Sequence, residues 1–450
     1  MMKLKNNPIF LVLLISMMLF GVSYAVDESG ANAPDLYGGV LKPVMFDETT
    51  GATIRLNTTD GGVTVTDEEG NPVDEWYNYD EKKWANAVTV DADDNITGYY
   101  VWIPRYAYSV NSGYHTSTVG VKKILFLNGT SNKDKEDNFH STMYESVEYI
   151  GDRQLQYLVH PAFSFGGNIT GFWMAKFEAS KSSSDTVRIL PNVTAWKSVS
   201  IGTAFDKAIA MKGNEEEYGL PAGSRANPHL VKNIEWGAMA YLTASKYGKE
   251  SEEVWINNYS KTVTGMGSNV SASATGNSKL TAVVDYKTKV NGKIQQSTTG
   301  NIYGIYDTSG GLWEYVAGYI NTRDQYNNAI DPNTEAVITK NGLNLFNSEY
   351  KYKDLYKRSA GNDGNENYNL ASAKKGDGVW ETSSTWYSTN SFSWFGDYSY
   401  MPNTYYPFFA RGGNYTYGTK AGIFSFMCTA GGANAMSGFR VTIAGLPETI

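Results

Sequence analysis

The chain has 450 residues, of which 19% are charged, and its 38 basic and 46 acidic residues give a net charge of −8 at pH 7. Acids and bases are interleaved, so the chain lacks the clustered positive charge of a nucleic-acid-binding protein. Aromatic residues reach 14%, with 33 Tyr against 18 Phe. This composition is typical of a globular protein rich in strands and loops.

The first 25 residues predict a secretory signal peptide. Two Lys precede an uncharged apolar run, and Ser23-Tyr24-Ala25 forms a small-x-small cleavage site. The uncharged run is also just long enough to span a bilayer, so an uncleaved N-terminal anchor is the alternative. In both cases we expect a secreted or cell-surface protein, which meets a membrane only through its N-terminus if that segment is not cleaved.

Two regions are predicted after the signal peptide. Residues 26–95 are polar, acidic and rich in turns, with short alternating stretches such as GATIRLNTT, and they predict a small β-rich N-terminal appendage. Residues 96–450 predict one larger domain, because stretches such as GYYVWIPRYAYSV and GFWMAKFEAS have the β-branched and aromatic character of strands.

Two helices are predicted in the larger domain, at about residues 201–212 and 228–247, from apolar residues that recur at spacings of three and four. The second helix is expected to begin at Asn227-Pro228, because Asn caps helices and Pro suits the first helical position. Gly248 is its expected C-terminal stop.

Two later segments have unusual compositions. Residues 320–378 are rich in Asn, Lys, Asp and Gly and predict a long polar insertion with one short helix around SEYKYKDLYKR. Residues 380–417 contain 14 aromatic residues, separated by Ser, Thr, Asn and Gly. Aromatic side chains mixed with small polar ones are typical of binding surfaces, although part of such a set must also form core.

Common catalytic motifs are absent from the sequence. The histidines do not have zinc-ligand spacing, and there is no Walker loop, nucleophile elbow or dinucleotide-binding fingerprint. His160 is interpreted as a structural histidine. Cys428 is the only cysteine, which excludes disulfides and Cys-rich zinc sites, and its apolar neighbours predict a buried, inert thiol.

Four motifs occur in a characteristic order. They are GFWMAKFEAS, HLVKNIEWGAMAYL, GNIYGIYDTSGGLWEYVAGY and RGGNYTYG…SGFRVTI, and their distinctive residues are Lys176-Phe177-Glu178, Glu235-Trp236, Gly304 through Tyr315, Arg411-Gly412-Gly413-Asn414 and Gly438-Phe439-Arg440. The series resembles the formylglycine-generating enzyme (sulfatase-modifying factor) family over roughly residues 96–446. The resemblance implies an α+β, C-type-lectin-like domain with helices packed on twisted antiparallel sheet and long loops outside.

The resemblance also implies a calcium site. Glu314 lies in an aromatic and apolar run, where a carboxylate is costly unless a cation or hydrogen-bond donors compensate it. In family members the corresponding glutamate and nearby carbonyl oxygens bind Ca²⁺. Carried over, Glu314 would supply a carboxylate and Gly310 and Leu312 would supply carbonyl oxygens. Gly311 replaces an Asn of the family's motif.

Other partners for Glu314 remain open from the sequence. The carboxylate could pair with an arginine, Arg440 or Arg411, or accept backbone hydrogen bonds. Asp307 lies seven residues earlier, and a perturbed pair of Asp307 and Glu314 in a deep pocket would be the sign of an enzyme with unrecognised chemistry.

The oxidase activity of the family is not expected. Family oxidases use two cysteines after the Arg-Gly-Gly motif, and these hold copper. The aligned positions here are Tyr417 and Gly422, and Cys428 lies six residues too late. One thiol cannot perform two-thiol chemistry, so we expect neither that enzyme nor a copper site.

A non-enzymatic recognition role is therefore predicted for the chain, as a secreted or cell-surface protein that binds a protein or glycan through aromatic loops. The expected ligand-binding residues are Trp386, Trp394, Tyr398, Tyr405, Tyr406, Asn414, Tyr415 and Tyr417. The segment 414–422 also resembles the variable zone of ligand-binding proteins diversified by retroelements. A structural, pilus-like envelope component anchored by its N-terminus is the alternative.

Overall fold

The computed structural model describes residues 29–59, 64–73, 75–109, 115, 123–141, 157–269, 282–359, 363–388 and 393–448. The predicted signal peptide, residues 1–25, lies outside the described residues. No helix in the described ranges combines the length and the apolar character that crossing a membrane requires.

The first of two large sheets is antiparallel and seven-stranded. Its buried central strands are β-branched and aromatic, as predicted for residues after 96. In spatial order the strands are β13 (Asn227–Leu230), β21 (Val441–Ala444), β10 (Gly171–Ala175), β6 (Ile96–Pro104), β5 (Asn86–Val90), β1 (Lys42–Phe46) and β2 (Thr53–Arg55).

The second large sheet is formed mainly by the C-terminal part of the chain. It is mixed, because β15 and β20 each run parallel to β14 and β17 runs parallel to β19. In order it contains β15 (Asp354–Tyr356), β14 (Trp313–Ile320), β18 (Phe408–Arg411), β19 (Phe426–Thr429), β17 (Ser399–Tyr400) and β16 (Tyr387–Ser388), and β20 (Ser437–Phe439) also pairs with β14.

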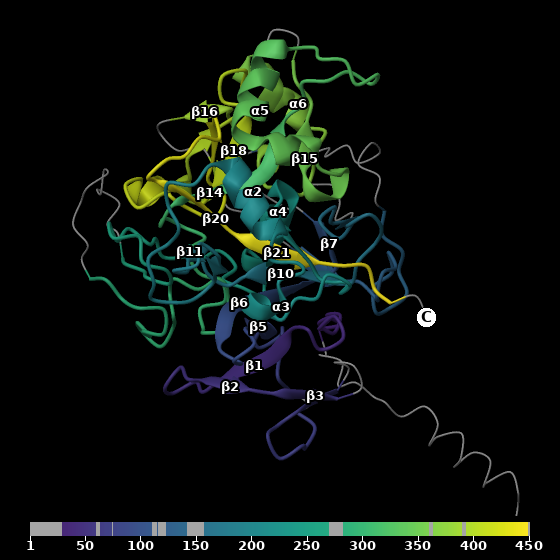
Figure 1. Cartoon of the computed structure of the whole chain (residues 1–450), viewed down its shortest axis with the longest axis vertical. Helices are drawn as coiled ribbons and strands as arrows, with labels where there is room; N and C mark the ends of the chain where they lie inside the picture. Colours follow the sequence, from purple (N-terminus) through teal and green to yellow (C-terminus); the bar gives the residue numbers. More distant parts are fainter. Residues whose placement is uncertain are drawn as a thin grey trace, which may run out of the picture.

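Smaller elements complete an α+β fold (Figure 1). The short strands are β3 (Asn57–Thr59), β4 (Thr64–Thr66), β7 (Tyr106–Ser109), β8 (Lys123–Phe126), β9 (Leu158–Val159), β11 (Ser180–Lys181) and β12 (Val187–Arg188). The α-helices are α2 (Ile201–Ile209), α3 (Glu215–Tyr218), α4 (Asn233–Thr243), α5 (Pro332–Asn347) and α6 (Gly364–Ala371), and the 3₁₀ turns are η1 (Tyr350–Tyr352), η2 (Trp380–Thr382), η3 (Trp394–Gly396) and η4 (Gly418–Lys420).

The two large sheets share one stretch of chain. Strand β20 pairs with β14 in the second sheet, and after Arg440 the chain continues as β21 in the first sheet. Arg440 therefore marks the point where the chain passes between the sheets. This position explains why Arg440 contacts residues of both sheets.

The predicted helices agree with the structure in part. The first is confirmed as α2, and Ser200 caps it by accepting a hydrogen bond from the Thr203 amide. The second prediction is wrong at its N-terminus, because residues 227–230 pair with β21 as strand β13. Helix α4 begins only at Asn233, where the Glu235 carboxylate accepts the Lys232 amide at 2.9 Å.

The insertion contains more structure than its composition predicts. Helix α5 precedes the expected position, and Asp331 caps it with hydrogen bonds from two backbone amides. The segment SEYKYKDLYKR holds η1 and β15 instead of a helix, because β15 completes the second sheet beside β14.

The N-terminal region is continuous with the larger domain. Strands β1, β2 and β5 belong to the first sheet, and the predicted boundary at residue 95 falls in the turn between β5 and β6. Trp84 is fully buried and donates its ring N–H to the Tyr247 carbonyl oxygen at 2.8 Å. The small pair of β3 and β4 is the part that forms a separate sheet.

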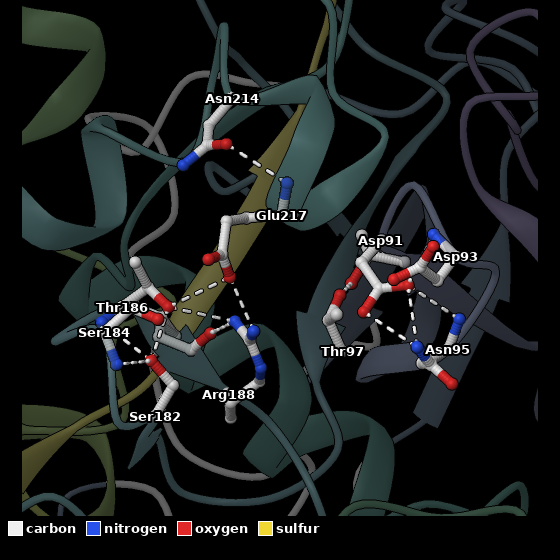
Figure 2. A network of polar contacts seen from close by, with 12 residues as sticks. Asp91, Asp93, Asn95, Thr97, Ser182, Ser184, Thr186, Arg188, Asn214 and Glu217 are labelled. Atoms are coloured by element: carbon white, nitrogen blue, oxygen red, sulfur yellow. Dashed lines mark hydrogen bonds and ion pairs between the residues drawn. The ribbon is translucent and has the colours of Figure 1, made fainter.

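Turns of one type, each five residues long, recur in the described structure. The side chain of the first residue accepts backbone N–H groups within the turn, and the fourth residue has positive φ. The five examples are Asp67–Asn71, Asp91–Asn95, Asp134–Asn138, Ser182–Thr186 and Asp324–Asn328. Figure 2 shows the turns at Asp91 and Ser182 with Glu217 of α3, which accepts hydrogen bonds from Thr186 and Arg188.

Candidate functional site

The carboxylate of Glu314 lies in the core and pairs with Arg440. Both side chains are fully buried, and the two Glu314 oxygens accept Arg440 Nε at 2.9 Å and Nη2 at 2.6 Å. Arg440 also donates to the carbonyl oxygens of Ala175 and Tyr306, at 2.8 and 2.9 Å. Burial raises the pKa of Glu314 to about 7, and Arg440 opposes that rise by stabilising the carboxylate.

This geometry confirms Arg440 as the partner of Glu314 among those the sequence left open. The other candidate, Arg411, donates instead to Asn233 Oδ1 and to the carbonyl oxygens of Asp377 and Ser425. Asp307 accepts hydrogen bonds from Asn257 and the Gly265 amide, so it is anchored separately from Glu314.

The loop predicted to bind calcium is packed against a second carboxylate. The Leu312 amide donates to Glu178 Oε1 at 2.7 Å, and the Gly310 amide donates to the Gly412 carbonyl oxygen. Burial, followed by the charges of Glu314 and Asp307, raises the pKa of Glu178.

Gly311 is required at this position by the close approach of Glu178. Its φ is +68°, and a Cβ there would lie 2.5 Å from Glu178 Oε1. No group of three or more His, Cys, Asp or Glu side chains suited to a metal occurs among the described residues. Calcium binding by Glu314, Gly310 and Leu312 stays a prediction.

Tyr417 and Gly422, which the resemblance aligns with the two cysteines of the oxidases, carry no thiol. The Tyr417 ring packs edge-on against Trp313 and Tyr398, with centroid distances of 5.1 and 5.2 Å. Cys428 is buried on β19, and burial raises the pKa of its thiol to about 12. At neutral pH this thiol is protonated and therefore a poor nucleophile.

A buried carboxylate occupies the space beside Gly422. A Cβ on Gly422 would lie 2.0 Å from Asp397 Oδ1, and Asp397 Oδ2 accepts the Phe424 amide at 2.8 Å. Burial and the neighbouring Glu253 raise the pKa of Asp397. In the described structure, Asp397 Oδ1 and Glu253 Oε1 are both buried without a hydrogen-bond partner.

The predicted structural role of His160 is confirmed. The ring is buried, accepts the Ala162 amide at Nδ1 and donates from Nε2 to the Gly376 carbonyl oxygen at 2.8 Å. Burial lowers its pKa to about 3, so the ring stays neutral.

Two of the predicted ligand-binding residues must be corrected, because they belong to the core. Trp394 is fully buried in η3 and its ring packs against Phe424 at 5.0 Å. Asn414 is also buried, where its Oδ1 accepts the amide and the hydroxyl of Thr416. Neither side chain is available to a ligand at the surface.

The other predicted residues differ in exposure. Trp386, Tyr398, Tyr415 and Tyr417 are half-buried, and the Trp386 ring packs against Tyr387 and Tyr400. Tyr405 and Tyr406 are exposed, at 75% and 48%. Of the eight residues, these two present the largest accessible aromatic surface.

Exposed tyrosines that the sequence did not single out lie in the insertion and near β16. Of the six exposed aromatic residues in the described ranges, five are tyrosines between residues 326 and 406, namely Tyr326, Tyr350, Tyr387, Tyr405 and Tyr406. The sequence did not predict Tyr326 and Tyr350 as binding residues, because they lie in a polar segment without a neighbouring Trp.

Strand directions place three of these tyrosines at one end of the second sheet. β14 ends at Ile320, whose amide donates to the Pro407 carbonyl oxygen, so the loops carrying Tyr326 and Tyr405–Tyr406 leave the same strand pair. Tyr387 lies elsewhere, because its partner Tyr400 follows Ser399, which pairs with Phe426 at the start of β19, level with Arg411 and Glu314. We call Tyr326, Tyr405 and Tyr406 the tyrosine end.

Comparisons with known proteins leave the family open. A scan against protein-family models finds no match to this chain, and a search of curated proteins finds none either. The resemblance to the formylglycine-generating enzyme family therefore rests on the motifs alone. The described structure is a mixed α+β fold, mostly of strands, with several antiparallel pairings.

Proposed function

We propose that this protein is a secreted or cell-surface recognition protein that binds a protein or glycan through the tyrosine end. The proposal includes a C-type-lectin-like scaffold without oxidase activity. The observation that carries it is the gathering of exposed tyrosines at one end of the second sheet. Tyrosine offers a large, rigid surface with a polar tip, which suits recognition of a wet surface.

The arrangement of the whole chain also supports a display role. In Figure 1 the helices α5 and α6 of the insertion lie at the opposite end of the long axis from β1, β2 and β3. A chain tethered through its N-terminal region would therefore hold the insertion away from its attachment.

The test is loss of binding in the Tyr405→Ala/Tyr406→Ala variant. We expect binding to cells or to an identified ligand to weaken by about tenfold or more, because buried tyrosines dominate many interfaces. Phe139→Ala is the matched control, since Phe139 is also an exposed aromatic residue, at 70%, but lies outside the tyrosine end. Equal affinity of the two folded variants would contradict the proposal.

A further inference from the structure

A polar cleft lies beside the tyrosine end. It has a volume of about 720 Å³ and is bounded by the loop after β14, the end of α5 and the segment that leads into β15. This volume is within the range of small-molecule sites. The residues that matter for its chemistry are Tyr319, Arg323, Gln325, Asn347, Tyr350 and Lys353.

The charges that line this cleft are compensated within the protein. Arg323 donates to both oxygens of Glu335, at 3.1 and 2.8 Å. Asp324 accepts backbone N–H groups of its own turn, and Lys353 donates to a carbonyl oxygen at the end of α5 at 2.6 Å. A charged ligand would have to displace one of these contacts, so the cleft favours a neutral one.

Neutral hydrogen-bonding groups remain available. Gln325 and Asn347 both line the cleft, and no described residue hydrogen-bonds either side-chain amide. Each amide offers donors and an acceptor, which matches the dual character of sugar hydroxyl groups.

Aromatic surface accompanies these amides. Tyr350 is 78% exposed and offers this surface, whereas Tyr319 is buried and packs against Phe346 with ring centroids 6.2 Å apart. A pyranose ring has an apolar C–H face and a rim of hydroxyls, so an aromatic ring beside amides is complementary to it.

The loop after β14, which forms one wall of the cleft, is held at two points. The Asn321 amide donates to the Tyr356 carbonyl oxygen at 2.7 Å, and the Arg323–Glu335 pair holds the loop on α5. Binding would therefore cost little ordering of the protein.

We propose that this cleft binds a neutral oligosaccharide through Gln325, Asn347 and Tyr350. The inference rests on the proposed recognition function and specifies its ligand class and a subsite. Three variants of the full chain test it: Gln325→Ala/Asn347→Ala, Tyr350→Ala and the control Lys340→Ala. Lys340 is exposed on α5 and does not line the cleft.

The probe is an array of neutral and anionic oligosaccharides, followed by titration of each hit in solution. We expect neutral glycans to bind, with about tenfold weaker affinity in both cleft variants and no change in Lys340→Ala. Binding of anionic glycans alone, or of neutral glycans equally by all variants, would overturn the assignment.

The same experiment separates this inference from the proposed function. Glycan binding that is lost only in Tyr405→Ala/Tyr406→Ala would refute the cleft and keep the tyrosine end. A protein ligand bound through the tyrosine end, without any glycan hit, would likewise refute the cleft alone. Absence of glycan hits together with unchanged cell binding by the tyrosine variant would refute both.

Discussion

Glu314 and Arg440 show how one buried residue pair connects two sheets. Glu314 lies on β14 of the second sheet, while Arg440 also holds the Ala175 carbonyl oxygen of β10 in the first. Removing one partner of such a pair leaves an uncompensated charge in the core, which is far costlier than losing an exposed ion pair.

We therefore expect Glu314→Gln to lower the free energy of unfolding by about 3–5 kcal/mol. Asp94→Asn is the matched control, because it breaks the exposed Arg55–Asp94 pair and should cost about 0.5 kcal/mol or less. Urea unfolding at pH 8, above the Glu314 pKa of about 7, measures both changes. A small effect of Glu314→Gln would mean that Arg440 finds other acceptors.

Because Glu253 is a buried carboxyl, we expect the stability of the protein to depend on pH. Burial raises its pKa to about 7, against an ordinary value of 4.5, so the folded state holds a proton that the unfolded state releases. This contribution to stability is fully present below about pH 4.5 and is lost as the pH rises through 7.

Glu253→Gln should remove this dependence, because glutamine does not ionise. We expect the fall in melting temperature between pH 5 and pH 8 to be smaller in the variant than in the wild type. Asp377, whose pKa burial raises to about 6, contributes to both proteins alike and so cancels in the comparison. Parallel pH curves for the two proteins would show that Glu253 is solvated.

Among the elements, the loop between β18 and β19 contains a glycine, Gly422, whose place a larger residue could not take. Gly422 has no room for a Cβ because Asp397 Oδ1 occupies that space, whereas the nearest atom to a Cβ on Gly432 is 3.8 Å away. Any side chain at position 422, a cysteine included, would therefore require Asp397 to move.

Gly422→Ala should destabilise the protein by about 1–3 kcal/mol through overpacking, and Gly432→Ala should have little effect. In an Asp397→Ala background the cost of Gly422→Ala should shrink, since the obstructing carboxylate is gone. A double-mutant cycle by chemical denaturation checks this coupling. Additive effects would mean that the two residues do not interact.

At the scale of the whole molecule, the calcium prediction can be tested by thermal unfolding of residues 26–450. We expect the melting temperature to be the same in calcium and in chelator, because both Glu314 oxygens are held by Arg440. A calcium-dependent rise that Glu314→Gln abolishes would instead support the predicted metal site.

Features that depend on local composition could be predicted from the residues alone. The strands at 96–104 and 171–175, the helix from 201 and the structural role of His160 all follow from residue types and spacing, whereas the α+β class was implied by the resemblance. The lack of a second cysteine is likewise a property of the sequence, and so is the absence of disulfides.

Similar local signals led to different elements because of the strands and helices packed against them. Asp331-Pro332 begins a helix, whereas Asn227-Pro228 enters a strand, because β21 offers a pairing partner only to the second. Burial is decided in the same way: Trp394 is in the core and Tyr405 in solvent, although both stand in one aromatic segment. Local residues fix what a segment can form, but the elements packed against it fix which form has the lowest free energy.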